Sequence, residues 1–188
     1  MHLPWHRPVA DPHRAFYLNE PAADPRNDIV ARIRDAKEGA VWPVKTETHT
    51  PAVMSAHVKE LARFFRADLC AIVRVEGADA MADNGESEPH AYGIVCVFQA
   101  EHAGWELLGI GAQTGALKGA FASFNLAAII REWGFRATRA QHVDGARLAA
   151  AACLGNLDRG GRLVTPQFGA KVYVADVILT DLPLQPDR

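Results

Sequence analysis

Leu69-Cys-Ala-Ile-Val-Arg-Val75 and Tyr92-Gly-Ile-Val-Cys-Val-Phe98 are two short β-rich runs in a chain of 188 residues. Both are mostly apolar and rich in β-branched side chains, a composition typical of strands buried at the centre of a sheet. The segment between them, Gly77 to His90, is acidic and polar and is expected to be a solvated loop. The two runs therefore predict the middle of a sheet.

Helices are predicted on both sides of these strands. Thr50-Pro51 gives an N-cap followed by proline at the first helical position, and the apolar residues that follow recur at helical spacing: Met54, Val58, Leu61 and Phe65. A short helix is predicted from Asp28 to Lys37, and a long one from Thr114 to about Trp133-Gly134. Asp144 is the expected N-cap of a further helix, residues 146–153.

Strands are predicted again in the C-terminal part, at 135–139 and 163–164 and as one long strand from Lys171 to Leu179. Alternating strands and helices are compatible with a doubly wound sheet, and the short late connections equally allow antiparallel pairing. The expected class is α+β, with a mixed central sheet.

Composition restricts the function. With 49% hydrophobic and 22% charged residues, the chain is expected to fold as one globular domain, and a net charge of −2 makes nucleic acid an unsuitable partner. The N-terminal residues carry prolines and charges where a signal peptide is apolar, and no apolar run reaches the length of a membrane span, so we expect a cytoplasmic protein. The histidines show no metal-ligand spacing. The three cysteines form no Cys-x-x-Cys pair, and we expect them to be buried and reduced: Cys70, Cys96 and Cys153.

The chain divides at residue 49 or 50. Residues 1–49 comprise a Pro-rich arm and a short helix, and residues 50–188 form the expected domain. Arms of this kind often wrap a neighbour or a partner subunit, so a homodimer is one expected state.

Three segments attract attention on physical grounds. The first, Gly155 to Gly161, holds three glycines in seven residues, which allows close approach to a ligand and also suits a plain turn. The second, Thr165-Pro-Gln-Phe-Gly169, is either a tight hairpin turn or part of a site. The third, Gly104 to Gly119, is expected to be a flexible loop, with or without the role of a lid. His142 either forms a proton-transfer pair with Asp144 or belongs to a helix cap.

The C-terminal third carries a family resemblance. It lies in the run Ala151-Ala-Cys-Leu-Gly-Asn-Leu-Asp-Arg-Gly-Gly-Arg-Leu-Val-Thr-Pro-Gln-Phe-Gly169 and in the later segment Val177-Ile-Leu-Thr-Asp-Leu-Pro-Leu184. Together these two segments resemble the cobalamin-binding domain of reductive dehalogenases and, more distantly, the epoxyqueuosine reductases. Ile129-Ile-Arg-Glu-Trp-Gly-Phe-Arg-Ala137 and the stretch from Met54 to Leu69 are also similar. The resemblance covers roughly residues 50 to 184 and implies a nitroreductase-like α/β sandwich.

The resemblance also implies a cofactor, cobalamin, and the residues that would line its pocket. These are the residues of the two turns, together with His142: Gly155, Arg159, Gly160, Gly161, Thr165, Pro166 and Phe168. The family's proton-donating tyrosine falls at Ala116 in a gapless match, where no phenol exists. In the family a basic residue accompanies that tyrosine, and the resemblance implies that Lys171 is its counterpart here. Tyr173 is close to Lys171 in sequence. Lys171 and Tyr173 are therefore the catalytic candidates.

The chain stops at Gln185-Pro-Asp-Arg188, where the family's cysteine-rich electron entry would begin. We therefore expect no iron–sulfur cluster in this chain, and electrons from a separate ferredoxin or flavoprotein. Three functions remain open: reduction of halogenated small molecules, non-catalytic carriage or processing of a corrinoid, and a structural subunit that binds none. The absent tyrosine favours the last two, and the glycine turns argue against the third.

Overall fold

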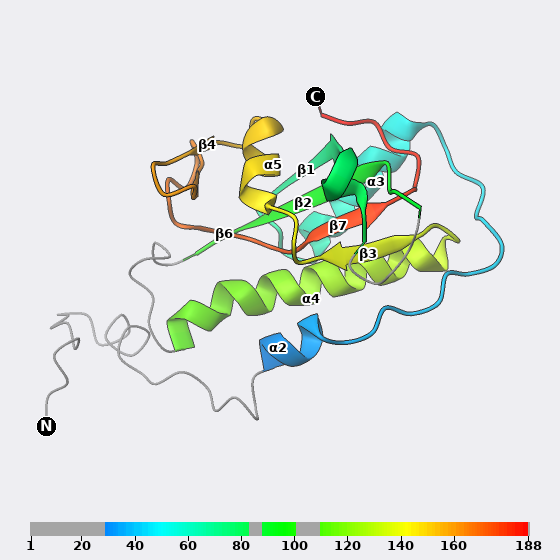
Figure 1. Cartoon of the computed structure of the whole chain (residues 1–188), viewed down its shortest axis with the longest axis horizontal. Helices are drawn as coiled ribbons and strands as arrows, with labels where there is room; N and C mark the ends of the chain where they lie inside the picture. Colours follow the sequence, from blue (N-terminus) through cyan, green and yellow to red (C-terminus); the bar gives the residue numbers. More distant parts are fainter. Residues whose placement is uncertain (1–28, 83–87, 101–109, 188) are drawn as a thin grey trace, which may run out of the picture.

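The computed structural model describes residues 29–82, 88–100 and 110–187, with only the backbone of 110–113. At its centre is a five-stranded sheet in the order β1-β2-β7-β3, with β6 also paired to β2 (Figure 1). The strands are β1 (Leu69–Arg74), β2 (Tyr92–Gln99), β3 (Ala137–Ala140), β6 (Val172–Val174) and β7 (Val177–Thr180). Both predicted strands are therefore present, and β2 is central as expected, but β1 lies at the edge of the sheet, so its expected central position is wrong.

Every pairing of this sheet within the described residues is antiparallel. The expected α+β class is confirmed, but the expected mixed sheet is wrong. The long helix α4 (Ile110–Glu132) carries the chain from β2 to β3, a connection that suits parallel neighbours. β7 lies between β2 and β3 and pairs with both, so each contact is antiparallel.

Two layers cover the sheet, one on each face. Helices α3 (Pro51–Phe64) and α4 pack on one face around a core that includes Ile72, Phe98 and Ile178. Helix α5 (Gly145–Ala151) and a small hairpin, β4 (Asn156–Leu157) with β5 (Leu163–Val164), cover the other face. Figure 1 shows α5 and the hairpin above the sheet and α4 below it.

The predicted caps are present. The Thr50 side chain accepts a hydrogen bond from the Val53 N–H at the start of α3, and Asp144 accepts one from the Arg147 N–H at 3.0 Å at the start of α5. A short 3-10 helix, η2 (Gly77–Ala80), interrupts the expected loop between β1 and β2. Residues 83–87 of that loop lie outside the described residues.

The glycine-rich loop expected from Gly104 to Gly119 is wrong from Ile110 onward, whereas the long helix expected after Thr114 is confirmed. Helix α4 begins at Ile110, so Gly115 and Gly119 lie inside a helix, while 101–109 fall outside the described residues. Glycine costs about 1 kcal/mol relative to alanine in a helix interior. It is nevertheless used here because a side chain from β6 occupies the space that a methyl group would fill.

The predicted long strand, Lys171 to Leu179, is interrupted. In the pairing with β2, Val174 faces Val97 but Ile178 faces Ile94, so one extra residue is inserted on the β6–β7 side. The inserted residue lies in the segment 175–177 and forms a β-bulge, which reverses the alternation of faces. Accordingly Ala175 packs with the α3–α4 core, whereas Val177, two residues later, packs with the opposite core.

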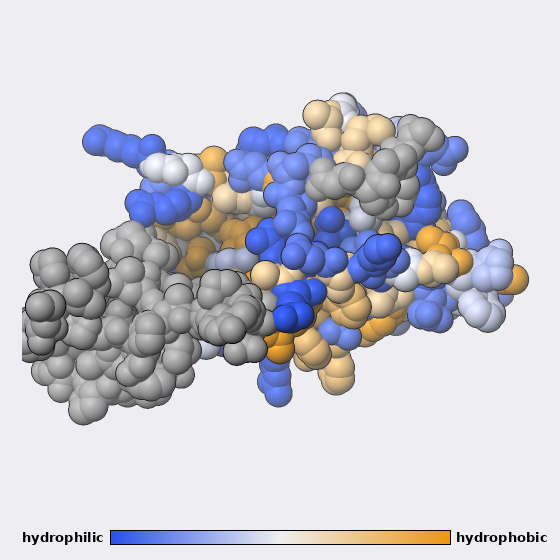
Figure 2. Space-filling model, turned by 60° about the horizontal axis from the view of Figure 1, so that its bottom comes forward, coloured by the Kyte–Doolittle hydropathy of each residue, from blue (hydrophilic) through white to orange (hydrophobic). Residues whose placement is uncertain are grey.

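Residues 29–49 lie along α4 and the end of β3 instead of extending away (Figure 1). Helix α2 (Ile29–Arg34) is shorter than predicted, and the carboxylate of Glu38 accepts a 2.7 Å bond from Arg139 Nε and contacts Arg131 at 2.5 Å. Both arginine side chains are almost fully buried, so Glu38 neutralises a buried pair of cations. Figure 2 shows this face, where hydrophobic residues are interspersed with hydrophilic ones.

Residues 1–28, which hold most of the Pro-rich arm and the Asp28 cap, lie outside the described residues, and the boundary at residue 49 or 50 stays a prediction. No helix in the described part of the chain is both long and apolar enough to cross a membrane.

Candidate functional site

Tyr173 lies at the centre of the candidate site, on β6, with its ring against α4. A Cβ atom added at Gly119 would come within 2.6 Å of Tyr173 Cε1, and one added at Gly115 within 3.0 Å of Tyr173 Cβ. The two glycines lie four residues apart and so share one helix face. The helical turn that they delimit contains Ala116, the position to which the resemblance assigns the family's tyrosine.

An ion pair stands beside this phenol. Arg34 donates two hydrogen bonds to the carboxylate of Asp176, at 2.8 and 2.7 Å, and the Asp176 side chain is only 10% exposed. Asp176 comes from the bulge segment between β6 and β7, and bulges are known to redirect a side chain next to active sites. The bulge segment therefore carries Asp176 near Tyr173, and Arg34 reaches this carboxylate from α2, in a distant part of the chain.

Burial raises the pKa of Tyr173 above its ordinary value, the negative charge of Asp176 raises it further, and the positive charge of Arg34 lowers it. The phenol therefore keeps its proton at neutral pH. Burial and Asp176 thus hold the proton on this hydroxyl, whereas the positive charge of Arg34 favours its release.

Lys171 lies at the end of the sheet, just before β6. Its carbonyl accepts a hydrogen bond from the Ala100 N–H at 2.9 Å, and its side chain is exposed. Side chains two residues apart on a strand share a face, so Lys171 is on the same face of the sheet as Tyr173. The cation that acts on the pKa of Tyr173 is, however, Arg34.

The turn from Thr165 to Gly169 is a closed one. The backbone N–H of Thr165 donates to the Gly169 carbonyl at 2.9 Å, the reverse bond is 2.8 Å, and the Thr165 hydroxyl accepts the Phe168 N–H at 3.1 Å. Thr165 is buried, whereas Pro166 is exposed and Phe168 half-buried. Gly169 has a φ of 58°, and a Cβ added there would have no atom within 4 Å, so its backbone faces open space.

The segment Gly155 to Gly161 forms the β4–β5 hairpin and its turn. The carboxylate of Asp158 accepts the N–H of Gly160 at 2.8 Å and of Arg162 at 3.0 Å, together with the Arg162 guanidinium at 2.9 Å. These bonds lower the pKa of Asp158, most strongly through Arg162. At Gly155 an added Cβ would lie 2.3 Å from the Val164 carbonyl oxygen, so this glycine serves the close approach of the hairpin strands. Arg159 projects from the turn and is exposed.

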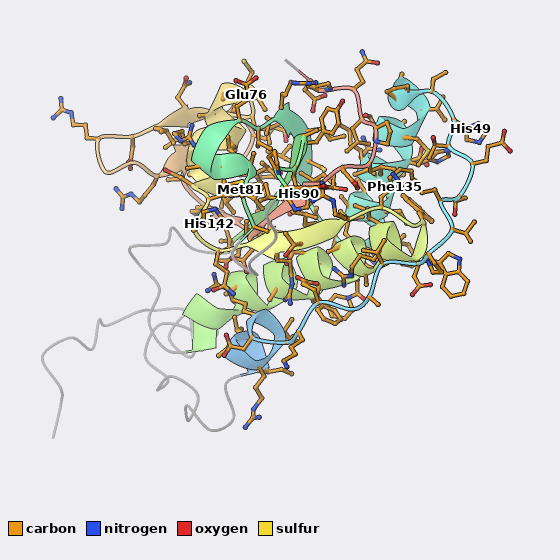
Figure 3. The ribbon with its side chains drawn as sticks, turned by 45° about the vertical axis from the view of Figure 1, so that its right-hand side comes forward. His49, Glu76, Met81, His90, Phe135 and His142 are labelled. Carbon is orange, nitrogen blue, oxygen red and sulfur yellow. The ribbon has the colours of Figure 1, made fainter. Side chains whose placement is uncertain are left out.

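His142 lies in the exposed segment after β3, where Figure 3 shows it near the end of that strand. Its predicted partner Asp144 binds the Arg147 N–H as the cap of α5. The Asp144 carboxylate therefore caps the helix, which is one of the two interpretations predicted for this segment.

The predicted residues fall into two groups separated by the sheet. Lys171 and Tyr173 are on the face that α4 covers, whereas His142 and the β4–β5 hairpin accompany α5 on the opposite face. The Thr165–Gly169 turn connects the groups at the end of the sheet. The four cavities described in the structure are lined by other residues.

Three residues of these arrangements were absent from the sequence-based prediction: Arg34, Asp176 and Asp158. Asp158 had a local signal, because an aspartate two residues before a Gly-Gly pair is typical of a turn that binds its own backbone. Arg34 and Asp176 had none, because they are 142 positions apart.

Comparison with known proteins gives one consistent result. No family model matches the sequence, and no curated protein matches it. Among solved structures, the catabolic reductive dehalogenase NpRdhA is 28% identical, over 85% of this chain and 24% of that chain, with a TM-score of 0.69. A reductive dehalogenase structure described in terms of B12-dependent dehalogenation matches with the same identity and coverage and a TM-score of 0.66.

An epoxyqueuosine reductase is 10% identical, over 71% of this chain and 47% of that chain, with a TM-score of 0.51, and thus shows a common fold only. The chain spans about a quarter of the length of the reductive dehalogenases that it matches. The resemblance predicted from the sequence is confirmed: in sequence and in structure, this chain is similar to one part of a reductive dehalogenase.

Proposed function

We propose that this chain is the cobalamin-binding part of a reductive dehalogenase-like protein, which reduces halogenated organic molecules with electrons from a separate ferredoxin or flavoprotein. The observation that carries the proposal is the 28% identity to a B12-dependent dehalogenase across 85% of the chain. Because the chain spans a quarter of such a protein, its activity, substrate and donor are all part of the proposal.

The residues at the end of the sheet fit such a cofactor. A corrin ring is flat and carries amide side chains, so it needs open backbone and polar groups at the rim of an apolar surface. Gly161 and Gly169 both have positive φ values and open space where a Cβ would stand. Thr165, Pro166 and Phe168 form the turn beside Gly169, and these three residues, with Arg159 and Gly160, are the ones that would hold the cofactor.

Bound cobalamin would supply a low-valent cobalt centre for breaking a carbon–halogen bond. The protein's own contribution is proposed to come from Tyr173, whose hydroxyl holds a proton at neutral pH and would deliver it to the substrate carbon. Arg34 and Asp176 fix the charge around that hydroxyl, and exposed Lys171 would attract an anionic substrate. Tyr173 would thereby replace the tyrosine absent at Ala116.

A second candidate function is a non-catalytic corrinoid carrier or processing module. Two observations favour it: Ala116 lacks the family's phenol, and the backbone N–H groups of Gly160 and Gly169 are already used within their turns. With either function we place the chain in the cytoplasm, and we assign its fold to the nitroreductase-like sandwiches, as the resemblance implies.

Titration of the purified chain with hydroxocobalamin tests the proposal. We expect a shift of the visible spectrum and co-elution of cofactor and protein. Absence of both would leave only the structural-subunit hypothesis and would overturn the proposal.

Halide release from 3-bromo-4-hydroxybenzoic acid, the compound in one matched dehalogenase structure, then separates enzyme from carrier. Under a strong chemical reductant we expect the loaded chain to exceed free cobalamin. Tyr173→Phe should bind cobalamin normally and lose about 10²-fold or more of the rate, as expected for a general acid. The control Tyr92→Phe removes a hydroxyl from the neighbouring strand β2 and should leave the rate unchanged. A rate equal to that of free cobalamin would identify a carrier.

A further inference from the structure

Cys70 on β1 and Cys96 on β2 face each other directly across the antiparallel pair. The backbone N–H of Val75 donates to the Ala91 carbonyl, so the hydrogen-bonded positions of this ladder are the odd-numbered residues of both strands. The Cys96 carbonyl instead accepts the Ala175 N–H at 3.0 Å, on the β6 side. Cys70 and Cys96 are therefore a non-hydrogen-bonded pair, the closer of the two kinds, with Cα atoms about 4.5 Å apart.

That spacing lies inside the range in which two cysteines can be bridged, roughly 4.4–6.8 Å between Cα atoms. Both side chains belong to the same face of the sheet, the one packed against α3 and α4. A hydrogen bond with the Cys70 sulfur, which favours the protonated form, and complete burial raise the pKa of the Cys96 thiol well above its ordinary value. Both cysteines are free, and the strand register places them side by side on this face.

The two thiols differ in access. Cys96 is 1% exposed, whereas Cys70 is half-buried on β1, a strand at the edge of the sheet. A reagent must therefore enter at Cys70. The prediction that all three cysteines are buried is wrong for Cys153, which is exposed because it follows the end of α5 in a left-handed conformation (φ 60°).

A cationic hollow lies where β1 begins. Its volume is about 560 Å³, and it is lined by three exposed cations, Arg63, Arg66 and Lys118, together with Ala67, Asp68 and Gln99. Asp68 is two residues before Cys70, and its carboxylate accepts the Gln99 N–H at 2.6 Å, so this charge is already engaged. The hollow therefore offers positive charge to an anionic molecule approaching β1.

We propose that Cys70 and Cys96 form a cross-strand dithiol that exchanges with anionic low-molecular-weight disulfides of the glutathione type. Cys70 attacks one sulfur of the disulfide, forms a mixed disulfide and releases one thiol. Cys96 then attacks the Cys70 sulfur and releases the second thiol. The two protein thiols are oxidised to one disulfide, the small disulfide is reduced to two thiols, and both protein protons end on the released thiols. This site is independent of cobalamin.

The test uses the full chain carrying Cys153→Ser, so that the exposed thiol does not react. After incubation with oxidised glutathione, intact mass and alkylation under denaturing conditions should show two thiols lost and no glutathione retained. Adding Cys96→Ser should trap one glutathione on Cys70, and adding Cys70→Ser should leave Cys96 unmodified. Charge reversal at the hollow, Arg66→Glu, should slow the first step several-fold with oxidised glutathione and not with a neutral disulfide.

Phenylarsine oxide provides a measurement without substitutions in the pair. The Cys153→Ser chain should bind one equivalent of phenylarsine oxide, with the arsenic held by both sulfurs. A dithiol competitor should therefore remove the arsenical, and a monothiol should not. The proposal is overturned if glutathione stays on Cys70 while Cys96 remains alkylatable, or if neither reagent engages both cysteines.

Discussion

Replacing Gly119 with alanine tests the placement of Tyr173 against α4. The new methyl group would stand 2.6 Å from Tyr173 Cε1 and 3.0 Å from Ala175 Cβ. Alanine gains about 1 kcal/mol over glycine in a helix interior. Forcing a methyl into an occupied space costs about 1–3 kcal/mol. A tyrosine ring cannot bend away, so we expect the free energy of unfolding to fall by up to about 2 kcal/mol.

The same substitution in a Tyr173→Ala background isolates the ring. The helix gain and the contact with Ala175 are present in both backgrounds and cancel, so only the clash with the ring differs between them. We expect the cost of Gly119→Ala to fall by about 1–3 kcal/mol, measured by urea unfolding followed by circular dichroism. Equal effects in the two backgrounds, or stabilisation of the wild-type chain by Gly119→Ala, would refute the packing of Tyr173 on this helix.

Three further outcomes follow from buried charge. Glu38→Ala should lower the free energy of unfolding by about 3–5 kcal/mol, because it leaves two buried guanidinium groups without their carboxylate. The control Glu60→Ala, on the exposed face of α3, should change it by less than about 0.5 kcal/mol. Urea unfolding of both variants measures the difference. Asp176→Asn should lower the pKa of Tyr173 and Arg34→Met should raise it, as measured by phenolate absorbance; shifts in the same direction would contradict the arrangement. The pKa of Tyr173 in the folded chain lies above its ordinary value of 10.0, so the unfolded chain loses this proton first as the pH rises. The free energy of unfolding should therefore decline above that pH, and it should decline less in Tyr173→Phe.

The parts of the fold that sequence predicts are those decided locally. The apolar runs of β1 and β2 and the caps Thr50 and Asp144 each act within a few residues, and the structure confirms them. Helix α4 begins at Ile110, before the predicted Thr114 and inside the stretch expected to be a loop, and within the helix the cost of Gly115 and Gly119 is offset by packing against β6. Such packing depends on a residue more than fifty positions away, which local patterns do not contain.

The bulge between β6 and β7 shows the same limit in a sheet. The run Lys171 to Leu179 has the composition of one strand, and nothing in it marks the extra residue opposite β2. The bulge is nevertheless what sets Asp176 beside Tyr173 and gives Arg34 its partner. Resemblance identified Tyr173 as a candidate, but its electrostatic surroundings come from tertiary structure.

The division of the predicted residues by the sheet constrains any ligand that uses both groups. Tyr173 points to the α4 side, and the glycine turn at 160–161 belongs to the α5 side, so a ligand inside either layer would reach only one group. Contact with both is available only past the end of the sheet, where Gln99 pairs with Val172 and the Thr165–Gly169 turn crosses from one side to the other. A ligand that contacts both groups would have to be large enough to span these strand ends. The proposed cofactor, whose choice rests on the identity to a B12-dependent dehalogenase, would therefore have to lie across the strand ends to use both groups.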